Sequence, residues 1–131
     1  MRCYSGMANR LPPKRVVLVV DDEALIRMNA VDMLQDAGFS VLEASDAAEA
    51  LVVLDGHPEI AVLFTDINMP GTMDGLDLAR RVHQLRPDVH LIVTSGKVTP
   101  GVDALPDDGA FLGKPYREQQ FIALVEAAFA R

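Results

Sequence analysis

The chain has 131 residues, a length that fits one domain built around a single core. Half of its residues are hydrophobic and 24% are charged, which is an ordinary globular composition. The formal net charge of -7 argues against binding to a nucleic-acid backbone, because that function needs a basic patch or stripe. Cys3 is the one cysteine, and no apolar run has the length of a membrane span or of a secretory signal. We therefore expect a cytoplasmic protein with no internal disulfide.

Strand and helix patterns alternate along the chain, and this alternation predicts a parallel sheet covered by helices on both faces. The continuous run VVLVV at 16–20 is typical of a strand buried on both sides. Further strands are expected at 39–44, 60–65, 89–94 and 110–113. The apolar stripes of the intervening helices are Ile26, Ala30, Met33 and Ala37; Ala47, Ala50, Leu51 and Leu54; Leu78, Val82 and Leu85; and Phe121, Leu124, Val125 and Ala128.

Caps and breakers set the limits of these elements. Gly38 stands where a helix C-cap glycine belongs, and Asp46 with Glu49 three residues later predicts a helix start. The segment GKVTPGVDALPDDG at 96–109 has helical spacing but contains two prolines, so its helix should be short or irregular. We expect residues 1–14 to be a disordered lead-in and residues 15–131 to form the folded domain.

In parallel α/β sheets, ligands bind beyond the carboxyl ends of the strands. Polar side chains follow several of the predicted strands at that edge. In chain order they are Asp21, Asp22, Glu23, Asp66, Thr94, Ser95 and Lys114.

These residue types together suit phosphoryl transfer. Asp21, Asp22 and Asp66 would repel one another at close range, and a hard divalent cation such as Mg²⁺ relieves that repulsion. Lys114 can neutralise a phosphoryl oxygen, Thr94 can donate a hydrogen bond to another, and the Asp66 carboxylate is a competent nucleophile. Two simpler interpretations stay open: Asp21 and Asp22 as the cap and first turn of a helix, and Asp66 as the start of an Asx-turn.

Four stretches, VVLVVDDE, FTDINMPG, IVTSG and FLGKPY, resemble the receiver domain of two-component response regulators over nearly all of residues 16–131. The resemblance implies a flavodoxin-like, doubly wound sheet of five parallel strands in the order 2-1-3-4-5. It also implies a cis bond between Lys114 and Pro115. One departure is Thr72, an extra residue in MPGTMDG, which predicts a different shape for the loop after Asp66.

By the same resemblance, Asp66 would accept a phosphoryl group from a phosphohistidine of a sensor kinase or a histidine phosphotransfer protein. Mg²⁺ would be held by Asp22, by Asp66 and by the backbone carbonyl of Asn68, with Asp21 acting through water. Lys114 would contact the phosphoryl group.

Thr94 would be the switch hydroxyl and Phe111 the switch aromatic, although pure packing is an equally good interpretation of Phe111.

The expected protein is a single-domain switch rather than an enzyme, since too few residues follow the last helix for an output domain. It would phosphorylate and dephosphorylate itself, and would act by binding an unidentified downstream protein, by relaying phosphoryl groups, or by draining them from a kinase. A phosphorylation-dependent dimer is a further option, and no direct contact with nucleic acid or membrane is expected. Two alternatives are a Mg²⁺-dependent phosphohydrolase with an aspartyl nucleophile and a receiver-like interaction module that is never phosphorylated.

Overall fold

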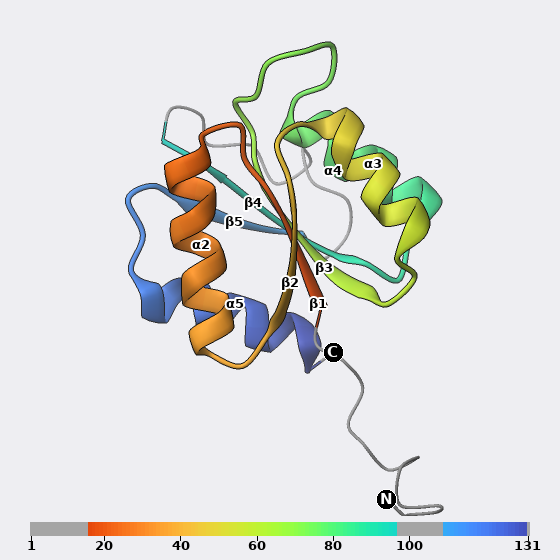
Figure 1. The fold of residues 1–131 in the computed structure, drawn as a ribbon. Coiled ribbons are helices and arrows are strands. Elements are labelled where there is room, and N and C mark those ends of the chain that lie inside the picture. The colour runs from red at the N-terminus through yellow and green to blue at the C-terminus, as the bar shows by residue number, and fades with distance from the viewer. Residues whose placement is uncertain (1–15, 97–108, 131) are drawn as a thin grey trace, which may run out of the picture.

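The computed structural model describes residues 16–96 and 109–130 (Figure 1). Within these residues, one parallel sheet has the strand order β2-β1-β3-β4-β5. This is the flavodoxin-like order expected from the sequence. The strands are β1 (Val16–Val20), β2 (Ser40–Ala44), β3 (Ile60–Asp66), β4 (His90–Ser95) and β5 (Ala110–Gly113). The helices are α2 (Ala24–Asp36), α3 (Ala47–Gly56), α4 (Gly75–Leu85) and α5 (Glu118–Phe129).

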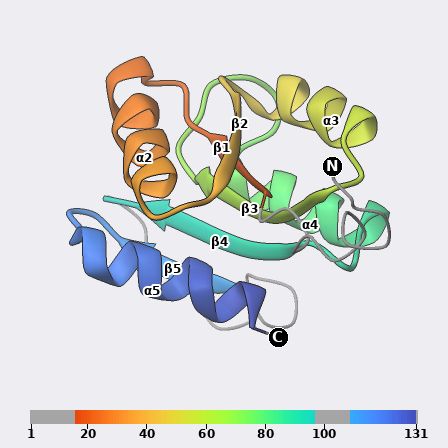
Figure 2. The ribbon, with the colours of Figure 1, turned by 60° about the horizontal axis from the view of Figure 1, so that its bottom comes forward.

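Helices cover both faces of the sheet, with α3 and α4 on one side and α2 and α5 on the other (Figure 2). The side chains of β1 alternate between the two resulting cores, because successive residues of a strand point to opposite faces. Val16, Leu18 and Val20 pack toward α3 and α4, while Val17 and Val19 pack toward α2 and α5. Burial of each such side chain contributes about 1.5–3 kcal/mol, which explains why β1 is apolar throughout.

The predicted caps of the first two helices are present. Gly38 has a φ of 95°, and the bonds from its N–H to the Gln35 carbonyl and from the Phe39 N–H to the Leu34 carbonyl close α2 in a Schellman motif. Asp46 caps α3 by accepting a hydrogen bond of 2.8 Å from the Glu49 N–H. The Glu49 carboxylate, however, bonds Ser45 rather than Asp46, so the reciprocal half of the capping box reaches one residue further back.

Two predicted helix faces need correction. Leu85, placed in the apolar stripe of its helix, is 59% exposed, because it lies at the end of α4 in a surface groove that α3 and α4 leave open. On α2, the buried set includes Val31 and Leu34, which the predicted stripe lacked, whereas Met33 and Ala37 are only partly buried. The buried face of α2 is therefore rotated from the predicted one toward Val31 and Leu34.

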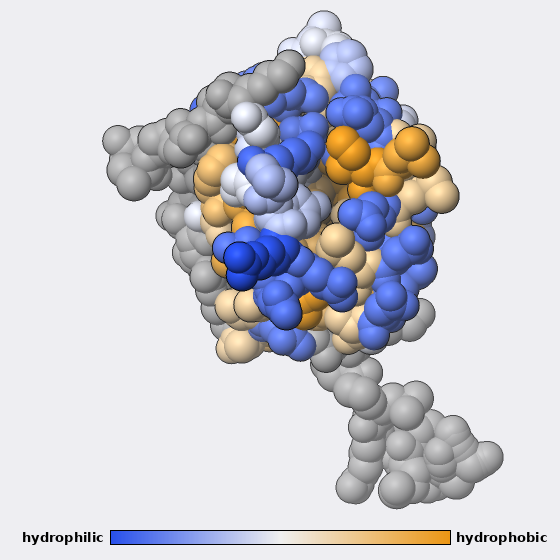
Figure 3. All heavy atoms as spheres, turned by 90° about the vertical axis from the view of Figure 1, so that its left-hand side faces the viewer, coloured by the Kyte–Doolittle hydropathy of each residue, from blue (hydrophilic) through white to orange (hydrophobic). Residues whose placement is uncertain are grey.

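The face on which α2 lies is mostly hydrophilic, with an apolar area near one edge (Figure 3). Leu25 and Met28, both on α2, are 81% and 54% exposed. The predicted lead-in at 1–14 and the predicted irregular helix between the fourth and fifth strands lie outside the described residues. Among the helices that the structure describes, none combines the length and the apolar character that a membrane span requires.

The start of α4, at Gly75, lies very close to the backbone at the end of β3. A Cβ atom on Gly75 would lie 2.0 Å from the Asp66 carbonyl oxygen and 2.8 Å from the Ile67 Cα, and backbone atoms cannot move aside as a flexible side chain can. Gly75→Ala should therefore lower the free energy of unfolding by about 1–3 kcal/mol or more. Urea denaturation measures this change.

Gly56→Ala is the matched control, since a Cβ on Gly56, at the end of α3, meets nothing within 4 Å. Equal stability of the two variants would show that α4 does not rest on the Asp66 peptide as described.

Candidate functional site

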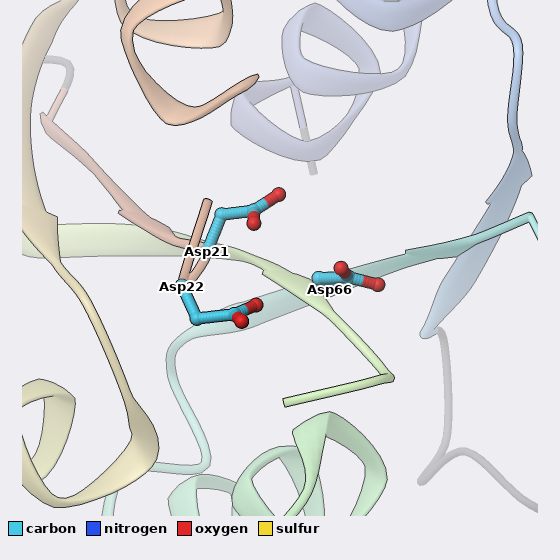
Figure 4. Close-up of side chains that lie close together, drawn as sticks. All are labelled: Asp21, Asp22 and Asp66. Atoms are coloured by element: carbon cyan, nitrogen blue, oxygen red, sulfur yellow. The ribbon is translucent and has the colours of Figure 1, made fainter. Parts of the chain in front are cut away.

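Asp21, Asp22 and Asp66, expected at one edge of the sheet, are brought together there. Asp21 and Asp22 follow β1 and Asp66 ends β3, and the three carboxylates point to the same side of these strand ends (Figure 4). One oxygen of each lies within 4.8 Å of the others. Asp21 and Asp66 are only 4% and 5% exposed, while Asp22 is exposed. The edge therefore holds three mutually close carboxylates, two of them largely removed from water.

Hydrogen bonds hold both the backbone and the side chain of Asp21. Its N–H donates to the Ala44 carbonyl at 3.2 Å, and its Oδ1 accepts from the Glu23 N–H at 2.9 Å. Burial raises the pKa of the Asp21 carboxyl; the Glu23 N–H and Lys114 oppose this shift, while Asp66 and Asp22 reinforce it. The cap interpretation is wrong, because the N-cap of α2 is Glu23 and no acid lies in the first turn.

Lys114 provides positive charge at this edge. It follows β5, and its Nζ lies 3.3 Å from Asp66 Oδ2 and 3.8 Å from Asp21 Oδ2. Its backbone N–H donates to the Ser95 carbonyl, which fixes the start of the side chain at the sheet edge. The Lys114–Pro115 bond is cis, as expected.

Thr94 pairs with Asp66 across β3 and β4, so the two residues lie side by side at the same level of the sheet. The Thr94 side chain is buried, and its hydroxyl donates to the Leu112 carbonyl of β5 at 2.6 Å. Phe111, the residue before Leu112, is partly buried and packs against the core on the α3 and α4 side. The Thr94 hydroxyl is therefore bonded to β5 at Leu112, the residue next to the predicted switch aromatic, Phe111.

Asn68 lies in the loop after β3. Its N–H donates to Asp66 Oδ1 at 3.2 Å, which is the Asx-turn contact considered from the sequence, and its side-chain amide donates to Ser95 Oγ at 2.8 Å. Asp66 therefore starts an Asx-turn and also belongs to the carboxylate cluster. The loop that contains Thr72 rises above the strand ends (Figure 1).

Sequence reasoning missed two residues of this region. Arg27 of α2 donates to the Asp21 carbonyl, and nothing in the helical pattern distinguishes it from a surface arginine. Tyr116 packs edge-on against Phe64, and burial, with smaller contributions from Asp21 and Asp66, raises its pKa to about 12. In the sequence, the position of Tyr116 directly after Lys114 and Pro115 is the one indication that it lies near this region.

The donor set of this edge fits a hard divalent cation. All three side chains offer carboxylate oxygens, the ligands that Mg²⁺ and Ca²⁺ prefer. The Lys114 ammonium contacts Asp66 and Asp21 but carries one charge against three, so the cluster keeps a negative surplus that a cation would offset.

Comparisons with known proteins agree with the fold. The family model of the response regulator receiver domain matches residues 17–126. The sensor kinase CckA of Brucella abortus (strain 2308) is 34% identical over 123 residues, which are 91% of this chain and 13% of that kinase. The response regulator receiver protein CpdR of the same strain is 34% identical over 117 residues, covering 86% of this chain and 94% of CpdR. A crystal structure of a response regulator receiver domain protein from Clostridium thermocellum has a TM-score of 0.82 at 28% identity, covering 88% and 94% of the two chains.

Fold and site together define a parallel α/β protein with acidic residues at the carboxyl ends of its central strands. The chain belongs to the receiver domain family of two-component response regulators. It spans only a small part of the kinase and nearly the whole of CpdR.

The buried carboxyl of Asp21 makes stability depend on pH. Because its pKa is raised in the folded chain, the folded state keeps a proton that the unfolded state has already released. The contribution of Asp21 to the free energy of unfolding is thus greatest at acidic pH and falls as pH rises through the raised pKa. In the presence of a chelator at neutral pH, Asp21→Asn should raise the thermal unfolding midpoint by a few degrees.

Asp32→Asn is the charge-matched control, because Asp32 is exposed on α2 and lies outside the carboxylate cluster. The advantage of Asp21→Asn should shrink as the pH is lowered. Stabilisation of the same size in both variants would instead point to general charge repulsion.

Proposed function

We propose that the chain accepts a phosphoryl group on Asp66, in a Mg²⁺-dependent reaction, from a phosphohistidine of a sensor kinase or a histidine phosphotransfer protein. The observation that carries this proposal is the position of the Asp66 carboxylate. It lies at the end of β3, 3.3 Å from Lys114 and within 4.8 Å of the Asp21 and Asp22 carboxylates. A buried carboxylate nucleophile beside a lysine ammonium and two further carboxylates is an arrangement suited to phosphoryl transfer.

The reaction is a transfer between two side chains. An Asp66 oxygen forms a bond to phosphorus while the bond from phosphorus to the donor's imidazole nitrogen breaks, and the imidazole leaves. Lys114, already in contact with Asp66 Oδ2, offsets the charge of a phosphoryl oxygen. Asp22, Asp66 and the Asn68 carbonyl would hold Mg²⁺, with Asp21 acting through water, and the bound ion would supply further positive charge to the phosphoryl oxygens. Attack of water on phosphorus later releases phosphate and restores Asp66.

The phosphorylated chain signals through a shift between two conformations. The Thr94 hydroxyl is bonded to the Leu112 carbonyl, a neutral acceptor. A phosphoryl group on the neighbouring Asp66 adds charged oxygens, which accept stronger hydrogen bonds. Reorientation of Thr94 toward them releases Leu112 and lets Phe111 move inward, so that the surface around β5 changes for a partner protein. The chain then acts as a switch, as a relay intermediate or as a phosphate sink, and not as an enzyme with a separate substrate.

The transfer itself is tested by the mass of the intact protein after incubation with acetyl phosphate. We expect one added phosphoryl group that requires Mg²⁺, is absent with excess chelator and is absent in Asp66→Asn, whereas Asp32→Asn should react as the unaltered chain does. An adduct that persists in Asp66→Asn would contradict the assignment of the acceptor. Absence of an adduct with rapid release of inorganic phosphate would favour a phosphohydrolase, and absence of both would favour an interaction module.

The switch is tested by Thr94→Ala. Acceptance of the phosphoryl group should survive in this variant, because the nucleophile and Lys114 are unchanged. The shift of the Phe111 and Leu112 amide resonances that beryllofluoride, a phosphoryl mimic, produces in the unaltered chain should be lost. Thr65→Val is a suitable control, since Thr65 is also buried and adjacent to Asp66 but bonds its own strand's Asp66 carbonyl. An equal resonance shift in Thr94→Ala and the unaltered chain would refute the proposed switch.

A further inference from the structure

The peptide bond between Asp21 and Asp22 is held from outside the carboxylate cluster. Arg27 Nη1 donates to the Asp21 carbonyl at 2.6 Å, which is a charge-assisted hydrogen bond to a backbone oxygen. On the other side of the residue, the Asp21 N–H bonds the Ala44 carbonyl of β2. Both peptide planes that flank the Asp21 Cα are therefore fixed, one by the sheet and one by Arg27.

Arg27 is itself held in place. Its Nε lies 3.1 Å from Glu43 Oε1, on β2, and its side chain is only 19% exposed. Its backbone N–H donates to the Glu23 carbonyl, which places the residue in the first turns of α2. The planar guanidinium can bond a carboxylate and a carbonyl at the same time, with two different nitrogens, and a lysine ammonium lacks this fixed fork. Arg27 thus joins the end of β2 to the turn that carries the acidic pair.

Asp22 is the residue that depends on this contact. It is exposed, and no hydrogen bond or ion pair to its side chain is found in the described part of the chain. Asp21, by contrast, is buried and accepts a hydrogen bond from Glu23. The direction of the Asp22 carboxylate is set mainly by the Asp21–Asp22 peptide plane, and Arg27 binds the oxygen of that plane.

We propose that Arg27 is a positioning residue for the divalent-cation site: it holds the Asp21–Asp22 peptide so that the Asp22 carboxylate faces Asp66, and Glu43 holds Arg27. The proposal rests on the cation site of the proposed function. It adds to that function the pair of Arg27 on α2 and Glu43 on β2, which lies outside the carboxylate cluster.

The direction in which Mg²⁺ affinity changes when Arg27 is replaced distinguishes a positioning role from a purely electrostatic one. Arg27 carries a positive charge near a cation site, so removal of that charge alone would tighten Mg²⁺ binding. Loss of a positioning contact acts in the opposite direction, because groups that orient metal ligands typically contribute 10- to 100-fold to metal affinity. Weaker Mg²⁺ binding in an uncharged variant therefore cannot arise from the charge of Arg27.

The experiment measures the Mg²⁺ dissociation constant by isothermal titration calorimetry on the full chain, with circular dichroism to confirm that each variant is folded. Arg27→Gln should weaken Mg²⁺ binding by about tenfold or more. Arg27→Lys keeps the charge and should recover only part of the affinity, because one ammonium does not reproduce both contacts. Arg80→Gln is the matched control, since Arg80 is half exposed on α4 and pairs only with Asp77 in the described residues; it should bind Mg²⁺ as the unaltered chain does.

Glu43→Gln provides a second and gentler variant, which leaves the Asp21 contact in place. It should weaken Mg²⁺ binding less than Arg27→Gln, and it should add little to the loss in the double variant, because both residues act through one contact. Unchanged or tighter Mg²⁺ binding in folded Arg27→Gln overturns the inference while the proposed function stands. Absence of Mg²⁺ binding in the unaltered chain overturns both.

Discussion

The structure depends on carboxylates that the fold holds close together against their mutual repulsion. Burial of an ionised carboxylate costs several kcal/mol unless other groups compensate it. Asp21 and Asp66 are nevertheless almost fully buried and near each other. The central strands β1 and β3 keep them there, because β1 is apolar throughout and β3 is apolar as far as Phe64, so neither strand can slide without exposing that surface. Lys114 offsets part of the charge, and the remaining negative surplus is one that a cation would offset.

Contacts across the sheet connect the site to the neighbouring strands and to α2. Asp66 and Thr94 are register partners, and Thr94 reaches across to β5, so three adjacent strands contribute to one short chain of contacts. On the other side, Arg27 and Glu43 connect the acidic turn to α2 and β2. The edge is therefore supported from both halves of the sheet, and a change in charge at Asp66 acts on elements that already touch one another.

The parts of this molecule that could be predicted from sequence are those governed by local rules. The run at 16–20 is apolar because both faces of β1 are covered, and the polar residues at the strand ends meet because parallel strands share an edge. What sequence reasoning missed depends on tertiary distances. Leu85 has the spacing of a buried residue, yet neighbouring helices do not close over it. Arg27 donates a hydrogen bond to a backbone carbonyl of the site, and Tyr116 is affected by its burial and by the charges of Asp21 and Asp66. No periodic pattern in the sequence predicts either of these.

The contact between Gly75 and the Asp66 peptide couples the acidic edge to α4 through backbone alone. The Gly75 N–H donates to the Ile67 carbonyl, and the first turn of α4 rests on the backbone that carries the acceptor. A displacement of that backbone is passed to α4 without any intermediate side chain, by direct steric contact. The second connection of this edge is a side chain, the Thr94 hydroxyl, which is bonded to β5. Because α4 and Phe111 of β5 pack in the same core, both connections end on one face of the sheet.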